Sequence, residues 1–202
     1  MKRTSTYQPF QHPALKLFFT RFAHPWVTIA IYVPAGVALV LGSLHLEARA
    51  WPSVLLWIGL GVFAWTLVEY LLHRFSFHRS RGGEPWKTFN SGLHLAHHRD
   101  VEAQDLILAP PFIGFLLGPV EVLLFSLLTG SLARGLLMEA GLFLGYFLYE
   151  WVHYSTHFGP ARGPLMKYWK AYHLCHHFKD PHGNFGVTTP LSDWVFRTRV
   201  QP

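Results

Sequence analysis

The sequence predicts an all-α integral membrane protein with four transmembrane helices and a histidine-rich helical cap on the cytoplasmic side. Half of the 202 residues are hydrophobic and only 14% are charged, which is too apolar for an ordinary soluble domain. Four apolar runs are long enough to form helices that cross a bilayer. The sequence also contains fourteen histidines, most of them clustered between or after these runs.

The expected spans lie at 27–46, 53–72, 106–129 and 132–149. At about 1.5 Å per residue, a helix of about 20 residues crosses a hydrocarbon core of roughly 30 Å. The third run contains Pro110, Pro111 and Pro119, which must kink or break its helix. The linkers 47–52 and 130–131 are too short for a domain, so each joins two spans as a hairpin.

The N-terminal residues 1–26 precede the first span. After Pro13 they place phenylalanine and leucine at helical spacing with Lys16 and Arg21 between them, which predicts an interfacial segment. They lack a short apolar core followed by a small-residue cleavage site, so no cleaved signal peptide is expected.

The basic residues predict the orientation of the chain in the membrane. Fifteen of the seventeen lysines and arginines fall on one side of the four expected spans, and the positive-inside rule makes that side cytoplasmic. Both termini and the histidine-rich segments 73–105 and 150–202 then share this side. The same basic residues are divided among several loops, so they do not form a face that binds nucleic acid.

Ten histidines form four spaced groups, which suggest metal binding. Residues three and four apart share one face of a helix, so HLAHH and HLCHH should each project three imidazoles in one direction, and HYSTH two. The pair in HRFSFH is five residues apart, a rotation of about 140° on an ideal helix, so it requires a frayed helix end. The grouped histidines are His73, His78, His94, His97, His98, His153, His157, His173, His176 and His177.

The remaining histidines stand alone and are not expected to bind metal; they are His12, His24, His45 and His182.

Ten imidazoles exceed the coordination of one ion, so two metal ions are expected. Five nitrogen ligands apiece would leave a position open on each ion for water, oxygen or substrate, as catalysis requires. Imidazole suits iron, zinc, copper and nickel, so the ligands do not name the metal. The single cysteine, Cys175, excludes an internal disulfide and a cysteine metal cage.

Several polar residues near the groups are candidates to orient the imidazoles or to lie beside the substrate. Among them are Glu69, Glu150 and Asp193.

The order HRFSFH, HLAHH, HYSTH, HLCHH, followed by NFGVTTPLSDWVFRT, resembles the membrane fatty acid hydroxylase superfamily, which includes sterol desaturases. The stretches EYLLHRFSFH and AYHLCHHFKD are especially similar to sphingolipid fatty acid 2-hydroxylases. The resemblance covers roughly residues 69–198 and implies that the chain is a single membrane-embedded hydroxylase domain.

This resemblance implies a di-iron-type centre that uses O2 to hydroxylate a lipid acyl chain, at C2 of a fatty acid or ceramide-like lipid. It carries over all ten grouped histidines as ligands and places the stretch from Asn184 to Asp193 beside the active site, which makes Asn184 a further polar candidate on the substrate side. Zinc can replace iron in a purified preparation. No HPGG haem-binding motif occurs in the sequence, so electrons are expected from a separate donor such as cytochrome b5 or ferredoxin.

Two alternatives stay open at this point. The same superfamily includes sterol and carotenoid oxidases and desaturases, which share the metal site. A histidine-rich metal transporter or sensor is an alternative of another class, but it requires ligands that line a path within the spans.

Overall fold

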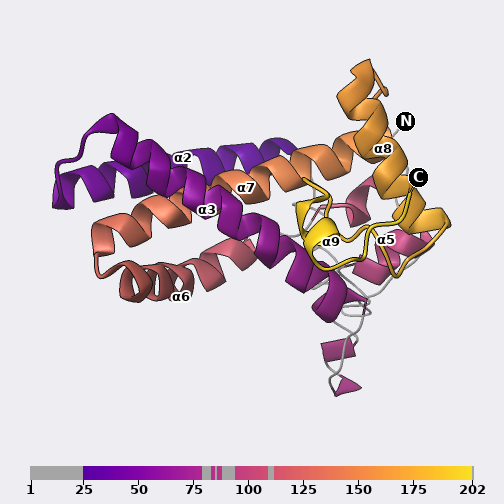
Figure 1. The fold of residues 1–202 in the computed structure, drawn as a ribbon, viewed down its shortest axis with the longest axis horizontal. Coiled ribbons are helices and arrows are strands. Elements are labelled where there is room, and N and C mark those ends of the chain that lie inside the picture. Colours follow the sequence, from indigo (N-terminus) through magenta and orange to yellow (C-terminus); the bar gives the residue numbers. More distant parts are fainter. Residues whose placement is uncertain (1–24, 79–82, 85, 88–93, 109–111, 202) are drawn as a thin grey trace. The chain divides into compact units, whose positions relative to one another are not determined.

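The computed structural model describes residues 25–78, 83–84, 86–87, 94–108 and 112–201. No strand occurs in these residues, and the expected all-α class is confirmed. The interfacial segment expected at 1–26 lies almost wholly outside the described part. The elements in chain order are α2 (Pro25–Leu46), α3 (Trp51–Leu71), the π-helix η1 (Leu72–Phe77), α5 (Ala96–Arg99), the 3-10 turn η3 (Gln104–Leu106), α6 (Phe112–Thr129), α7 (Leu132–Phe158), α8 (Gly163–Phe178) and α9 (Leu191–Val195) (Figure 1).

The chain divides into two compact units. The helical unit consists of 26–65 and 111–148, and the histidine unit consists of 1–25, 66–110 and 149–202. Helices α3 and α7 each contribute residues to both units. All ten grouped histidines belong to the histidine unit.

Close backbone contact holds α3 and α7 together within the helical unit. A Cβ atom added to Gly61 would overlap the carbonyl of Met138, and one added to Gly141 would overlap the carbonyl of Ile58. Glycine is therefore required on both sides of this crossing. Small residues are the usual means by which helices approach closely in a bilayer, where burying apolar surface gives little driving force.

Aromatic rings fill the space between α2, α6 and α7 in the same unit. The Tyr32 ring lies 4.9 Å from the Phe143 ring and 4.9 Å from the Tyr146 ring, measured between centroids. The Ser43 hydroxyl, near the end of α2, donates to the Ala133 carbonyl at 2.7 Å. This bond satisfies a buried polar group without water, which an apolar surrounding demands.

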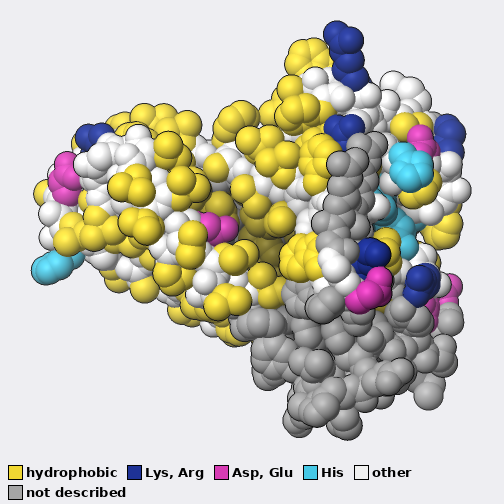
Figure 2. Space-filling model, turned by 90° about the horizontal axis from the view of Figure 1, so that it is seen from below, with side chains coloured by type: hydrophobic (Ala, Val, Ile, Leu, Met, Phe, Trp, Pro, Cys, Tyr) yellow, Lys and Arg dark blue, Asp and Glu magenta, His cyan; other side chains and the backbone are white. Residues whose placement is uncertain are grey.

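The outer surface of the helical unit is strongly apolar. Leu127 and Leu128 on α6 are each 72% exposed, and Leu55 and Phe63 on α3 are 65% and 59% exposed. Figure 2 shows hydrophobic side chains covering most of the surface over these helices, with few charged side chains among them. A surface of this extent and composition suits lipid contact rather than water.

Three helices are long and apolar enough to cross a membrane: Trp26–Leu46, Trp51–Phe77 and Leu132–Phe158. The third expected span, 106–129, is shorter than predicted, because its helix begins only at Phe112. Its 18 residues reach about 27 Å. Residues 104–106 instead form a 3-10 turn, and the sequence between the turn and the helix contains Pro110 and Pro111, which disfavour helix in the residues before them.

The fourth expected span, 132–149, continues as one helix to Phe158. The 27 residues of α7 reach about 40 Å, more than a hydrocarbon core of roughly 30 Å requires. The HYSTH pair therefore lies on the last turns of a spanning-length helix rather than on a separate segment.

Candidate metal centre

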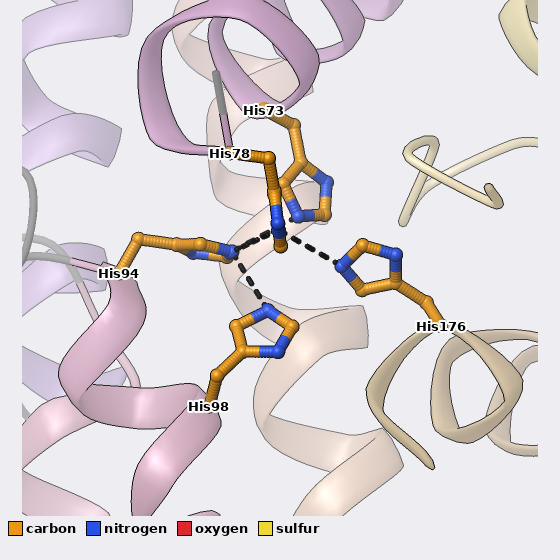
Figure 3. Close-up of side chains that lie close together, drawn as sticks. All are labelled: His73, His78, His94, His98 and His176. Atoms are coloured by element: carbon orange, nitrogen blue, oxygen red, sulfur yellow. Dashed lines mark hydrogen bonds between the residues drawn. The ribbon is translucent and has the colours of Figure 1, made fainter. Parts of the chain in front are cut away.

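The ten grouped histidines form two clusters of five in the histidine unit, as the sequence predicts. Within each cluster the ring nitrogens all lie within 4.8 Å of one another. The first group is His73, His78, His94, His98 and His176 (Figure 3), and the second group is His97, His153, His157, His173 and His177.

Each HxxHH box divides its histidines between the two groups. His94 and His98 enter the first group while His97, one residue from His98, enters the second. In the later box, His173 and His177 belong to the second group and His176 to the first. The residues four apart stay together because they stack on one helix face, and the residue three along is rotated enough to reach the other group. The expectation that each box points in a single direction was too coarse.

A π-helical turn brings His73 and His78 into one group. The His78 amide donates to the His73 carbonyl at 3.2 Å, a bond between residues five apart. Such bonding stacks residues five apart on nearly the same face, whereas an α-helix separates them. The expected frayed helix end is therefore replaced by the regular π-helix η1.

The Nε2 atoms of the first group converge on one point (Figure 3). His94 Nε2 lies 3.0 Å from the Nε2 atoms of His73 and His78 and 2.9 Å from that of His98. His176 Nε2 lies 3.1 Å from that of His78. One ring nitrogen has a single proton or a single lone pair, so hydrogen bonding cannot account for three partners of His94 at once.

The second group shows the same convergence. His97 Nε2 lies 3.2 Å from the Nε2 atoms of both His153 and His177. His173 Nε2 lies 2.8 Å from that of His157 and 3.0 Å from that of His177. Nitrogen ligands at right angles around an ion about 2.1 Å away are about 3.0 Å apart. The spacing in both groups therefore fits a metal ion.

The two groups adjoin each other. The His98 ring of the first group stacks on the His177 ring of the second, with centroids 4.0 Å apart and planes inclined by 22°. His97 and His98 are also neighbours in the chain. Two ions held by these groups would therefore be close neighbours and could act on one small molecule.

Burial keeps the imidazoles neutral. It lowers the pKa of His176 to about 4, and together with the neighbouring His176 it lowers the pKa of His78 to about 3. Burial also holds the pKa values of His94, His97 and His173 well below the usual 6.5, with the surrounding imidazoles adding to the effect. Neutral imidazoles offer the lone pair that a metal ion requires, so the ligands are available at neutral pH.

Backbone carbonyls set the orientation of two rings in the first group. His73 Nδ1 lies 2.5 Å from the Phe185 carbonyl oxygen, and His176 Nδ1 lies 2.6 Å from that of Gly183. A carbonyl oxygen can only accept, so both Nδ1 atoms donate and both Nε2 atoms carry the lone pair. This is the tautomer that a metal bound at Nε2 needs.

Two of the four polar candidates hold the segment 183–188 that provides these carbonyls, which we call the carbonyl loop. The Asp193 carboxylate accepts from the Phe185 amide at 2.9 Å and from the Gly186 amide at 2.7 Å. The Glu69 carboxylate accepts from the amides of Val187 and Thr188 and from the Thr188 hydroxyl.

Asn184 lies in the carbonyl loop itself, and Glu150 lies elsewhere. Asn184 has a φ of 55° and accepts from the Val200 amide at 2.7 Å through its side-chain oxygen. Glu150 is buried on α7, three residues before His153. The lone histidines His45 and His182 are exposed and lie outside both groups, and His12 and His24 lie outside the described residues.

The carbonyls of Gly183 and Phe185 were missed by sequence reasoning, because a backbone acceptor leaves no mark in residue type. Tyr172, whose hydroxyl donates to Asp193 at 3.1 Å, was also missed. Its place directly before His173 is the only sequence signal that could have drawn attention to it.

Comparisons with known proteins show the family to which this chain belongs. Residues 58–198 match the model of the family described as fatty acid hydroxylase. The chain belongs to the fatty acid hydroxylase family. It is 36% identical over 176 residues to a dihydroceramide fatty acyl 2-hydroxylase of Arabidopsis thaliana, a match that covers 86% of this chain and 72% of that protein.

Other members of the family are similar over a smaller share of their length. The chain is 35% identical over 142 residues to the fatty acid 2-hydroxylase of Homo sapiens, covering 69% of this chain but only 38% of the human protein. A solved structure of full-length Scs7p, in which only the hydroxylase domain is visible, superposes with a TM-score of 0.78 at 31% identity. That superposition covers 88% of this chain and 67% of the Scs7p chain.

Proposed function

We propose that this member of the fatty acid hydroxylase family is an O2-dependent lipid hydroxylase that uses two metal ions held by its ten grouped histidines. The observation that carries the proposal is the convergence of five Nε2 atoms in each of two adjoining groups. In the reaction, a CH2 group of the lipid, O2, two electrons and two protons give a CHOH group and water. One C–H bond and the O–O bond are broken: one oxygen atom becomes the hydroxyl group on that carbon, and the other takes up the two protons and two electrons and leaves as water.

The proposed substrate is an acyl chain oxidised at C2, in a fatty acid or a ceramide-like lipid. The support is the family membership together with the printed activities of the relatives, a dihydroceramide fatty acyl 2-hydroxylase and a fatty acid 2-hydroxylase. The C-terminal ends of helices α3 and α7, which are of spanning length, also belong to the histidine unit. A lipid held in the bilayer would present the headgroup end of its acyl chain at that depth.

Iron is the proposed metal, with zinc as a replacement in purified protein. Bound iron would supply the one-electron chemistry that activates O2, with electrons delivered by an external donor such as cytochrome b5 or ferredoxin. The chain's own residues hold and orient the ions through ten Nε2 atoms. Their lowered pKa values keep protons from competing for those atoms at neutral pH.

Four spans, with termini and metal centre on the cytoplasmic side, are the proposed topology. The support is that the α2–α3 and α6–α7 turns lie at the same end of the helical unit, at the left of Figure 1. Only two of the seventeen basic residues, Arg49 and Arg134, belong to those turns and their flanks. In this topology helix α6 is the third span in chain order despite its length, which requires local thinning of the bilayer.

Sterol or carotenoid oxidation is the alternative within the enzyme class, and the similarity to 2-hydroxylases disfavours it. A metal transporter or sensor needs ligands in series along a path through the spans. The ten histidines instead form two closed groups of five in one unit, which disfavours transport.

Product analysis tests the proposed reaction. Cells that express the chain are supplied with iron and 18O2. Their total lipids are extracted, and tandem mass spectrometry measures the mass of each lipid and the position of any added oxygen. We expect acyl chains that gain a single labelled oxygen at C2, and loss of this product in the His153→Ala and His176→Ala variants. Acyl chains that lose two hydrogens without gaining oxygen would instead identify the protein as a desaturase. If no oxidised lipid forms when metal and reductant are present, the proposal is contradicted.

A further inference from the structure

The carbonyl loop (183–188) is fixed by buried carboxylates on both of its sides. Asp193 is fully buried and accepts four hydrogen bonds, from the Phe185 and Gly186 amides, the Tyr172 hydroxyl and the Thr198 hydroxyl, at 2.7–3.1 Å. A carboxylate with this many donors cannot turn without losing several of them.

Glu69 anchors the far end of the same loop. It is 3% exposed, and its two oxygens accept from the Val187 amide and from the amide and hydroxyl of Thr188. The sequence separation between Glu69 and Thr188 is 119 residues, so this contact ties α3 to the C-terminal part of the histidine unit.

The carbonyl loop serves only one of the two groups. Its two carbonyl oxygens, of Gly183 and Phe185, accept from the Nδ1 atoms of His176 and His73, and both of these histidines belong to the first group. The rings of His73 and His176 also pack against the Phe185 ring, each with centroids 5.6 Å apart. Two of the five rings of the first group are therefore fixed in orientation by hydrogen bonds at Nδ1 and by contact with the Phe185 ring.

The second group has less support of this kind: among the described residues, its one ring with a backbone hydrogen bond is His153, which contacts Ile107. The Nδ1 atoms of His97, His173 and His177 are buried, and none has a hydrogen-bond partner among the described residues. Three of its five rings are therefore oriented by packing alone. A buried donor without an acceptor is unfavourable, and no carbonyl fixes the tautomer of such a ring.

We propose that the two metal positions are unequal: the first group binds its ion more tightly than the second, and Asp193 and Glu69 are positioning residues for that ion alone. The inference rests on the proposed two-ion centre. Its physical basis is that an Nδ1 donor bound to a carbonyl makes the opposite Nε2 more basic and holds the ring at the ion. Removal of such partners typically weakens metal binding by about 10–100-fold.

Cobalt binding to the whole chain measures the two positions separately. Metal-free protein in detergent is titrated with Co²⁺, and binding is followed by visible absorption and by direct cobalt analysis. We expect two steps in the wild-type chain, with dissociation constants that differ by about tenfold or more. His94→Ala should remove the tight step and His97→Ala the weak step, which assigns each step to its group.

The loop variants then test the role of the carboxylates. Asp193→Asn should weaken the tight step about 10–100-fold and leave the weak step unchanged. Thr188→Val, which removes one bond to Glu69, should weaken the tight step by less. Glu47→Gln is the matched control, because Glu47 is exposed in the α2–α3 linker and pairs only with Arg49 among its described contacts, so neither step should change.

Several outcomes would overturn the inference. Equal shifts of both steps in Asp193→Asn and Thr188→Val, no shift in either, or a tight step that His97→Ala removes would each contradict it. If Asp193→Asn loses helical circular dichroism, Thr188→Val decides by the same criterion. Failure of the two-ion centre itself gives a different result, because the wild-type chain would then bind fewer than two Co²⁺ ions.

Discussion

At the scale of single residues, helical spacing predicted that eight of the ten grouped histidines share helix faces with their neighbours, because residues three and four apart lie on one face, whereas His73 and His78 are five apart. Their division into two groups was not predictable. It depends on the rotation of about 100° between the fourth and fifth residues of each HxxHH box, both histidines, and on how α5 and α8 are placed in the histidine unit. The roles of the two carboxylates could not be predicted from the sequence either, because Asp193 and Glu69 accept hydrogen bonds from backbone amides rather than from histidines.

Paired substitutions within one box test the division. The double variant His94→Ala with His98→Ala removes two ligands of the first group, so the chain should retain one metal ion. The double variant His97→Ala with His98→Ala removes one ligand from each group, and both ions should be weakened or lost. Metal analysis of purified protein distinguishes the two variants.

The control for these pairs is His45→Ala with His182→Ala, which changes two exposed histidines outside both groups and should keep two ions. Equal metal content in the two ligand pairs would contradict the division of the box.

Helix periodicity located the elements well but missed two features of their backbone. The π-helix η1 contains the one histidine pair that α-helical spacing could not explain. Helix α6 starts later than its hydrophobicity suggests, since prolines before Phe112 weigh against helix there. Both features depend on hydrogen bonding of the main chain, and apolar periodicity does not report it.

Changing the length of η1 tests its role. Deletion of Ser76 leaves His73 and His78 four residues apart, which an ordinary α-helical turn also places on one face. We therefore expect this variant to keep the first metal ion. Insertion of one alanine after Phe75 separates the histidines by six residues and should abolish that ion. Cobalt binding measures both, and equal binding by the two variants would contradict the account of η1.

The α3–α7 crossing makes a prediction about stability. Gly61→Ala places a methyl group against the Met138 carbonyl and should lower the free energy of unfolding by about 1–3 kcal/mol. Gly59→Ala is its control, because no atom lies within 4 Å of the added Cβ, and it should be neutral or slightly stabilising. Denaturant unfolding in detergent measures both, and equal midpoints would contradict the proposed packing.

At the scale of the whole molecule, composition and the length of the apolar runs together were enough to predict a membrane-embedded helical protein. The positive-inside rule adds an orientation, with both termini on the cytoplasmic side, which stays a prediction. Membership of the fatty acid hydroxylase family then predicts that the two histidine groups of the histidine unit take part in lipid hydroxylation.

Cysteine labelling tests the orientation. In a Cys175→Ala background, Ala48→Cys in the α2–α3 linker should react with a membrane-impermeant maleimide added to intact cells. His182→Cys, in the exposed segment after α8, should react only after the membrane is permeabilised. Reaction of both positions from the same side would contradict the proposed topology.

The claim on which the function depends is that ten imidazoles form two adjoining metal positions. Anomalous X-ray scattering from crystals of the metal-loaded chain tests it most directly. Two peaks are predicted, one surrounded by the Nε2 atoms of the first group and one by those of the second. A single peak shared by both groups, or none, would contradict the account.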